Sequence, residues 1–208
     1  MILELKPKNN IAKKLVVFLH GLGSDGQDLL GLAPYFAKEF PDYHFYSPNG
    51  IEKCDMSAFG YQWFSLKNRD SHAITSELER VSPSVLDLIE NKLNELRLTY
   101  KDLIIIGFSQ GTMLALYIAH ANNIQIATII GFSGVFLPPE TIKNNKIPIC
   151  LIHGTSDEVV TFSSLHRSKE KLEAVGSIVE TYAVKNLCHS IDLTGLKFAA
   201  DFIKKHVK

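Results

Sequence analysis

The chain has 208 residues, of which 46% are hydrophobic and 21% are charged, and its 22 basic residues balance its 22 acidic ones. This length and composition are typical of one ordinary globular domain, which we expect over residues 1–208. A formal net charge of zero argues against a surface that binds polyanions, so we expect no nucleic-acid partner.

The chain shows no signal for export or membrane insertion. Residues 1–7 lack the apolar core of a signal peptide and predict a short edge strand. The longest apolar stretch, residues 127–137, is interrupted by polar residues and glycine and is shorter than the roughly 20 residues of a membrane span. We therefore expect a cytoplasmic protein without stable membrane insertion.

Three cysteines, Cys54, Cys150 and Cys188, give an odd count without a C-x-x-C spacing. This pattern predicts neither a disulfide framework nor a zinc cluster.

Apolar segments of strand length alternate with segments of helical period. We expect strands at residues 15–19, 44–47, 103–106, 127–130, 149–152 and 178–182. Helices are expected from Ser82 to Leu96, over residues 112–119, from about Ser163 to a stop at Gly176, and over residues 194–205. Ser82 would be the N-cap of the first helix, since Pro83 is favoured at a first helical position. The alternation predicts an α/β fold, with a mostly parallel central sheet and helices on both faces.

Residues 52–79 have weak periodicity and carry several aromatic residues. An irregular segment of this length predicts a lid or a substrate-binding loop. The alternative is a small satellite core, and the sequence favours neither for the aromatic side chains near Trp63.

The pentapeptide Gly107-Phe108-Ser109-Gln110-Gly111 follows an apolar strand and precedes a helical segment. This context is that of the nucleophile elbow of α/β-hydrolases, in which a strained turn exposes the serine hydroxyl. The pattern predicts Ser109 as a nucleophile. A tight turn that happens to contain serine is the alternative.

A serine nucleophile needs a base, and in this fold the expected chain order is serine, acid, histidine. Of the later histidines, His120 lies within a helix, His153 precedes the candidate acid and His166 faces solvent. His189 lies in a short loop between the last strand and the last helix, so it is the predicted base. Asp157, after the strand at 149–152, is the predicted acid, with Glu158 as its competitor.

Two backbone N–H groups are expected to hold a developing oxyanion. One belongs to Gln110, the residue after the nucleophile. The other is assigned to Leu22, in the glycine-rich loop that follows the strand at 15–19.

With these residues assembled, the chain resembles the phospholipase/carboxylesterase family of α/β-hydrolases, which includes the acyl-protein thioesterases. The resemblance rests on five segments: His20-Gly21-Leu22-Gly23, Trp63-Phe64, residues 107–111, Gly154-Thr155-Ser156-Asp157 and Cys188-His189. It implies a serine carboxylesterase that acts on esters, thioesters or lysophospholipids of short to medium acyl chains, without a metal or an organic cofactor.

The resemblance also assigns individual residues and an assembly. It places Leu22 and Gln110 at the oxyanion positions and Trp63 beside the acyl site. We add Phe64 and Val159 as substrate-binding residues. The expected partner is a small ester or an acylated substrate, and a homodimer is the expected assembly.

Three other functions compete with this hypothesis. Residues 21–26 spell G-x-G-x-x-G, the dinucleotide-binding pattern, but the acidic residue expected after the second strand is absent. His153, Cys188 and His189 are metal-ligand residue types without a metal-binding spacing. A non-catalytic binding protein that retains the fold is the third alternative.

Overall fold

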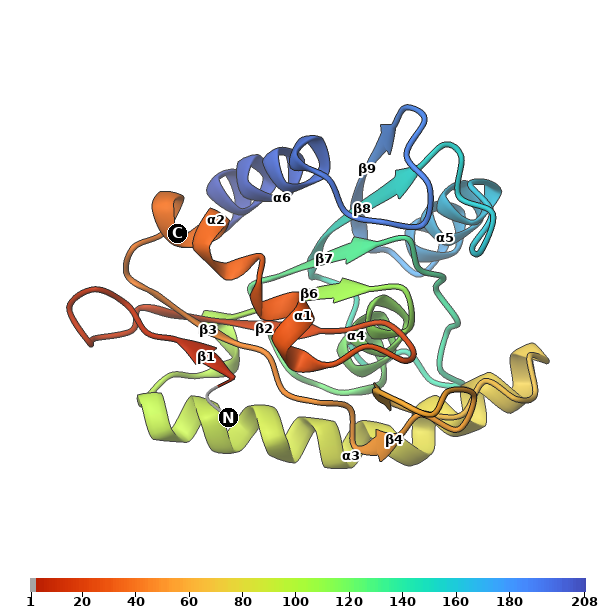
Figure 1. The fold of residues 1–208 in the computed structure, drawn as a ribbon, viewed down its shortest axis with the longest axis horizontal. Coiled ribbons are helices and arrows are strands. Elements are labelled where there is room, and N and C mark those ends of the chain that lie inside the picture. Colours follow the sequence, from red (N-terminus) through yellow and green to blue (C-terminus); the bar gives the residue numbers. More distant parts are fainter. Residues whose placement is uncertain (1–2) are drawn as a thin grey trace.

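A computed structural model describes residues 3–208, and its centre is a seven-stranded sheet (Figure 1). The strand order is β1-β3-β2-β6-β7-β8-β9. In chain order these strands are β1 (Glu4–Leu5), β2 (Lys14–Leu19), β3 (Tyr43–Tyr46), β6 (Leu103–Phe108), β7 (Thr128–Phe132), β8 (Pro148–Gly154) and β9 (Ile178–Val184). Among the described residues of this sheet, β1 pairs antiparallel with β3 and the other pairs are parallel, which confirms the predicted mostly parallel sheet.

Helices cover both faces of the sheet. Helices α1 (Gly26–Leu30), α2 (Ala33–Glu39) and α6 (Leu193–His206) pack on one face, and α3 (Ser71–Leu96), α4 (Gln110–Ala121) and α5 (Ser163–Ala174) on the other. Within β2, Val16 and Phe18 point to the first group and Leu15 and Val17 to the second. Both faces are therefore buried, which explains the continuous apolar runs of the central strands.

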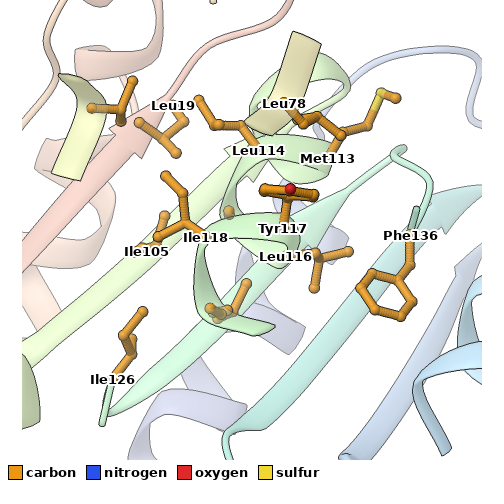
Figure 2. Close-up of a cluster of buried hydrophobic side chains, with 14 of the residues drawn as sticks. Leu19, Leu78, Ile105, Met113, Leu114, Leu116, Tyr117, Ile118, Ile126 and Phe136 are labelled. Carbon is orange, nitrogen blue, oxygen red and sulfur yellow. The ribbon is translucent and has the colours of Figure 1, made fainter. Parts of the chain in front are cut away.

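Helix α4 lies deep in the core, between α3 and the sheet (Figure 2). Every residue from Gln110 to His120 is buried. The cluster around it includes Leu78 from α3, Ile105 from β6 and Phe136 after β7. A helix with apolar residues on all of its faces is buried and packed against neighbours on every side. The position of its first residue, which follows Ser109, is fixed by this packing.

The predicted start of the long helix is wrong. Helix α3 begins at Ser71, where the Asp70 carboxylate accepts hydrogen bonds from the N–H groups of His72 and Ala73. Pro83 lies inside this helix. A proline in a helix interior removes one backbone hydrogen bond and costs about 3 kcal/mol. Ile74 and Leu78 extend the buried stripe before the proline, and their burial outweighs this cost.

Three further elements differ from the sequence-based expectations. The two short helices α1 and α2 have no counterpart among the predicted elements. Residues 52–79 are not irregular throughout, because they contain a two-stranded hairpin, β4 (Glu52–Lys53) with β5 (Tyr61–Gln62), and the first turns of α3.

The predicted edge strand is β1, while Met1 and Ile2 lie outside the described residues. Over residues 3–208 we find no helix with the length and apolarity needed to span a membrane.

Candidate active site

Ser109 occupies a sharp turn between β6 and α4. Its backbone has φ 52° and ψ −111°, a conformation that L residues rarely adopt. The two glycines of the pentapeptide allow this turn. A Cβ on Gly111 would lie 1.9 Å from the Leu19 carbonyl oxygen, and one on Gly107 would lie 2.5 Å from the Thr112 nitrogen. The strained serine is therefore held by close backbone packing on both sides.

Asp157 and His189 meet in a short hydrogen bond. The His189 Nδ1 atom lies 2.8 Å from Asp157 Oδ2. The other carboxylate oxygen, Oδ1, accepts the N–H groups of Val159 and Val160, each at 2.9 Å. Asp157 is only 5% exposed. Burial alone would raise the pKa of Asp157, but the bonds from His189 and from these two N–H groups lower it more.

The ionised carboxylate also defines the histidine tautomer. A carboxylate only accepts hydrogen bonds, so His189 Nδ1 carries the proton and donates it to Asp157. The Nε2 atom of the neutral ring is then free to accept a proton. The His189 ring packs on the Phe108 ring with centroids 4.8 Å apart, which places it beside the turn that carries Ser109.

The other candidates for acid and base lie elsewhere. Glu158 is exposed, and Asp157 is the carboxylate that contacts the His189 ring. His120 is buried in α4, where its ring nitrogens lie 2.7 Å from the Leu116 carbonyl oxygen and 2.9 Å from Ser177 Oγ. His166 is exposed on α5.

The sequence does not single out His153 as a site residue, but its ring contacts the predicted acid. Its Nε2 atom lies 2.8 Å from the Val160 carbonyl oxygen and 3.3 Å from Asp157 Oδ2. The N–H at this position donates to the Val160 carbonyl oxygen, which holds the ring beside the carboxylate that contacts His189. The available signal in the sequence is the spacing of four residues between His153, near the end of β8, and Asp157, which follows that strand.

The N–H groups of Leu22 and Gln110 are free in the part of the chain from residue 3 to residue 208, since neither has a hydrogen-bond acceptor there. Gln110 is the first residue of α4, where backbone N–H groups have no partner within the helix. The Leu22 loop lies against the elbow, because a Cβ on Gly21 would be 3.5 Å from the Ser109 Cβ. Both predicted donors therefore lie close to the serine.

Two of the three predicted substrate-binding residues belong to the core. Trp63 and Phe64 have no exposed surface and pack in the same cluster as Leu78 and Met113. Because no solvent reaches them, the structure does not support the prediction that their side chains contact substrate. Val159 is 69% exposed and follows Asp157 by two residues. Val159 therefore remains a predicted substrate-binding residue.

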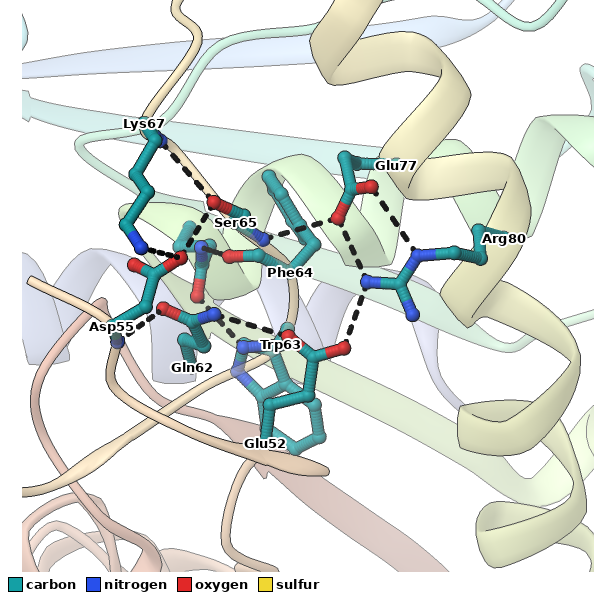
Figure 3. A network of polar contacts seen from close by, with 10 residues as sticks. Glu52, Asp55, Gln62, Trp63, Phe64, Ser65, Lys67, Glu77 and Arg80 are labelled. Carbon is teal, nitrogen blue, oxygen red and sulfur yellow. Dashed lines mark hydrogen bonds and ion pairs between the residues drawn. The ribbon is translucent and has the colours of Figure 1, made fainter.

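A polar network ties residues 52–67 to α3 (Figure 3). Arg80 donates to both Glu52 and Glu77, and the Ser65 N–H donates to Glu77. Ser65 also donates to Asp55 through its hydroxyl group. These bonds would have to break before the segment could move as a lid.

A large open pocket of the described chain lies away from the serine. Its volume is about 860 Å³, and it runs between the first half of α3 and residues 137–143, with Tyr117 and Lys171 in its walls. Neither Ser109 nor His189 lines it. Within residues 3–208 no three His, Cys, Asp or Glu side chains come together as a metal site, so His153, Cys188 and His189 do not form one there.

Burial lowers the pKa of four histidines, His20, His44, His120 and His153. In the unfolded chain each regains an ordinary value of about 6.5, so below that pH the unfolded chain binds more protons. Their contribution to stability is complete above about pH 6.5 and is lost as the pH falls through the lower folded-state values. We expect the urea midpoint to drop between about pH 7.5 and pH 5, with a slope of up to about 1.4 kcal/mol per pH unit for each proton. An unchanged midpoint over this range would contradict the buried, neutral state of these rings.

The chain order of the site residues and the topology of the sheet together define the class of protein. A strained serine follows β6, a buried aspartate follows β8 and a histidine follows β9, in a mostly parallel sheet with helices on both faces. This is the architecture of an α/β-hydrolase and not of a dinucleotide-binding domain. The sequence model of the phospholipase/carboxylesterase family matches residues 2–207. The chain belongs to the phospholipase/carboxylesterase family, whose members hydrolyse carboxylic esters.

Individual relatives agree with this assignment. Esterase YpfH from Escherichia coli (strain K12) is 26% identical over 193 residues, which cover 93% of this chain and 83% of that protein. Acyl-protein thioesterase 1 from Saccharomyces cerevisiae is 28% identical over 225 residues, which cover 98% of this chain and 97% of that protein. The crystal structure of esterase PE8 is similar with a TM-score of 0.91 and 33% identity, over 98% of this chain and 97% of that one.

Proposed function

We propose that this chain is a serine carboxylesterase in which Ser109 is the nucleophile, His189 the base and Asp157 the acid that orients the base. The observation that carries the proposal is the 2.8 Å bond between the buried Asp157 carboxylate and His189, whose ring packs beside the strained Ser109 turn. An ordinary surface histidine has no need of a buried carboxylate partner. The family membership supports the same class of reaction.

The mechanism requires an ionised Asp157 and a His189 ring whose proton is on Nδ1. Ser109 Oγ forms a bond to the ester carbonyl carbon while its proton passes to His189 Nε2. The carbonyl π electrons move to oxygen, and the N–H groups of Leu22 and Gln110 hold that oxyanion. The tetrahedral intermediate collapses, the alcohol or thiol leaves with the proton from His189, and an acyl-enzyme remains. Water, deprotonated by His189, then attacks the acyl carbon and releases the acid and Ser109.

The acyl chain is proposed to lie on exposed apolar side chains next to the site. Met56 and Phe59 are exposed at the tip of the β4–β5 hairpin, which is bonded to the Leu22 loop through Gly23 N–H and Tyr61 O at 2.9 Å. Val159 is exposed beside Asp157. An open apolar rim favours short to medium acyl chains, as esters or thioesters, over a chain that needs a deep channel.

A series of p-nitrophenyl esters from acetate to palmitate tests this substrate class. We expect kcat/KM to rise from acetate to medium chains and then to fall. Each methylene that contacts the rim contributes up to about 0.8 kcal/mol, or about fourfold in kcat/KM. The Val159→Ser variant should lose this gain while its rate with acetate stays unchanged. If the Val159→Ser variant keeps the full chain-length profile, Val159 does not contact the acyl chain.

A fluorophosphonate probe tests the nucleophile without assuming an acyl preference. Ser109 Oγ should form a bond to phosphorus while the P–F bond breaks and fluoride leaves. Mass spectrometry of the digested protein should then find the adduct on the peptide that contains Ser109. An adduct on another residue, or none after prolonged exposure, would reject the proposed function.

A further inference from the structure

A buried histidine lies directly before the oxyanion loop. His20 has no exposed surface, and the Gly50 N–H donates to its Nε2 atom at 2.8 Å. A backbone N–H can only donate, so Nε2 is unprotonated, and the proton of the neutral ring is on Nδ1. Burial lowers the pKa of His20 and so favours this neutral form. The Nδ1–H group then donates to the Gly21 carbonyl oxygen at 2.7 Å.

This hydrogen bond sets the direction of a neighbouring donor. The Gly21 carbonyl and the Leu22 N–H belong to one planar trans peptide unit, in which the two groups point in opposite directions. When the carbonyl oxygen is held by the His20 ring, the Leu22 N–H points away from that ring. This peptide unit lies against the elbow, since Gly21 is packed on Phe108 and Ser109.

Trp63 connects the same segment to the second donor. Its indole Nε1–H donates to the His20 carbonyl oxygen at 2.9 Å, and its ring lies 5.1 Å from the His20 ring. The Trp63 main-chain N–H donates to Gln110 Oε1 at 2.9 Å. Gln110 in turn donates through Nε2 to the Phe64 carbonyl oxygen at 2.8 Å. Trp63 thus links the loop after β2, which carries Leu22, to the start of α4, which carries Gln110.

We propose that His20 and Trp63 are positioning residues that hold the Leu22 and Gln110 N–H groups at the geometry of the oxyanion. This inference rests on the proposed function and goes beyond it, because neither side chain reaches the substrate. The sequence predicts that Trp63 contacts the acyl chain, but its burial and two hydrogen bonds give it this other role. We name the pair the His20–Trp63 clamp.

The test compares two variants that differ in one hydrogen bond. Both His20→Asn and His20→Phe lose the acceptor for the Gly50 N–H, but an Asn side chain retains an N–H at the place of Nδ1. His20→Phe should lower kcat by about tenfold to a hundredfold with KM within twofold, since loss of a whole oxyanion donor costs about 10²–10³. His20→Asn should recover most of this loss. Trp63→Phe, which removes the indole N–H and leaves a smaller aromatic ring, should lower kcat by about tenfold.

A trifluoromethyl ketone gives a second readout that a merely structural role would not move. Ser109 Oγ adds to the ketone carbon, the proton passes to His189, and the resulting alkoxide occupies the place of the oxyanion. Its inhibition constant should rise in proportion to the loss of kcat/KM across the three variants. Thermal unfolding of each variant shows whether it is folded. If His20→Phe does not fold, the comparison of Trp63→Phe and His20→Asn with the wild type carries the test.

The outcomes separate this inference from the proposed function. Wild-type kcat in folded His20→Phe or Trp63→Phe protein would overturn the clamp, as would equal losses in His20→Asn and His20→Phe. In those cases hydrolysis by the wild type would still depend on Ser109. Hydrolysis that is unaffected by Ser109→Ala would instead overturn the proposed function itself.

Discussion

Replacement of Ser109 by alanine is expected to lower kcat for ester hydrolysis by about 10⁴- to 10⁶-fold. The variant loses the atom that forms the acyl-enzyme, while the Leu22 and Gln110 N–H groups remain to bind the carbonyl oxygen. A small residual rate over uncatalysed hydrolysis should therefore persist. The fold should be retained, because alanine fits wherever serine does and the backbone N–H of residue 109 still donates to the Phe132 carbonyl oxygen.

Ser133 offers a matched control for this variant. It follows β7 as Ser109 follows β6, and its φ of 48° is close to the 52° of Ser109. Its buried Oγ has no hydrogen-bond partner among the described residues. Ser133→Ala should thus keep both stability and turnover. Stopped assays on p-nitrophenyl acetate, with circular dichroism of both variants, compare them. A rate for Ser109→Ala within tenfold of the wild type would remove Ser109 from the mechanism.

Replacement of Asp157 by asparagine is expected to lower kcat by about 10³- to 10⁴-fold, with little change in KM. The geometry gives the reason. Two backbone N–H groups, from Val159 and Val160, point at Oδ1, so the introduced side-chain amide must place its oxygen there. Its NH₂ group then faces His189 Nδ1 and donates to it. The ring would be forced to carry its proton on Nε2, where it can no longer accept the proton of Ser109.

Glu158→Gln is the control for this variant, because Glu158 is exposed and adjacent in sequence. It should retain wild-type turnover. The same pair of variants decides between the two acids that the sequence left in competition. If Glu158→Gln loses turnover and Asp157→Asn retains it, the proposed acid is wrong. A combined Ser109→Ala and Asp157→Asn protein should be little slower than Ser109→Ala alone, since the residues act as a unit.

The clamp and the triad would contribute to catalysis in different ways. Loss of a triad member removes a group that forms a bond or moves a proton. Loss of His20 or Trp63 only relaxes the direction of two N–H groups that remain present. The expected losses therefore differ by at least about a hundredfold for Ser109, and a single set of kinetic assays distinguishes them.

The sequence by itself determined the fold class and the segments that form the site. Apolar runs such as residues 103–106 predict buried parallel strands, because a strand covered on both faces needs apolar side chains at every position. The glycines around Ser109 predict the strained turn for a similarly local reason, since any Cβ there meets the backbone within 3 Å. Signals of this kind lie within a few residues, where sequence patterns are informative.

The tertiary structure decided how distant segments meet. Trp63 bonds to residues 43 and 47 positions away, and no local pattern distinguishes such a residue from one that contacts substrate. The sharing of Asp157 between His153 and His189 likewise depends on how β8 and the loop after β9 come together. The start of α3 before Pro83 depends on the burial of Ile74 and Leu78. In each case long-range packing, which costs chain entropy and is offset by burial, outweighs the local preference.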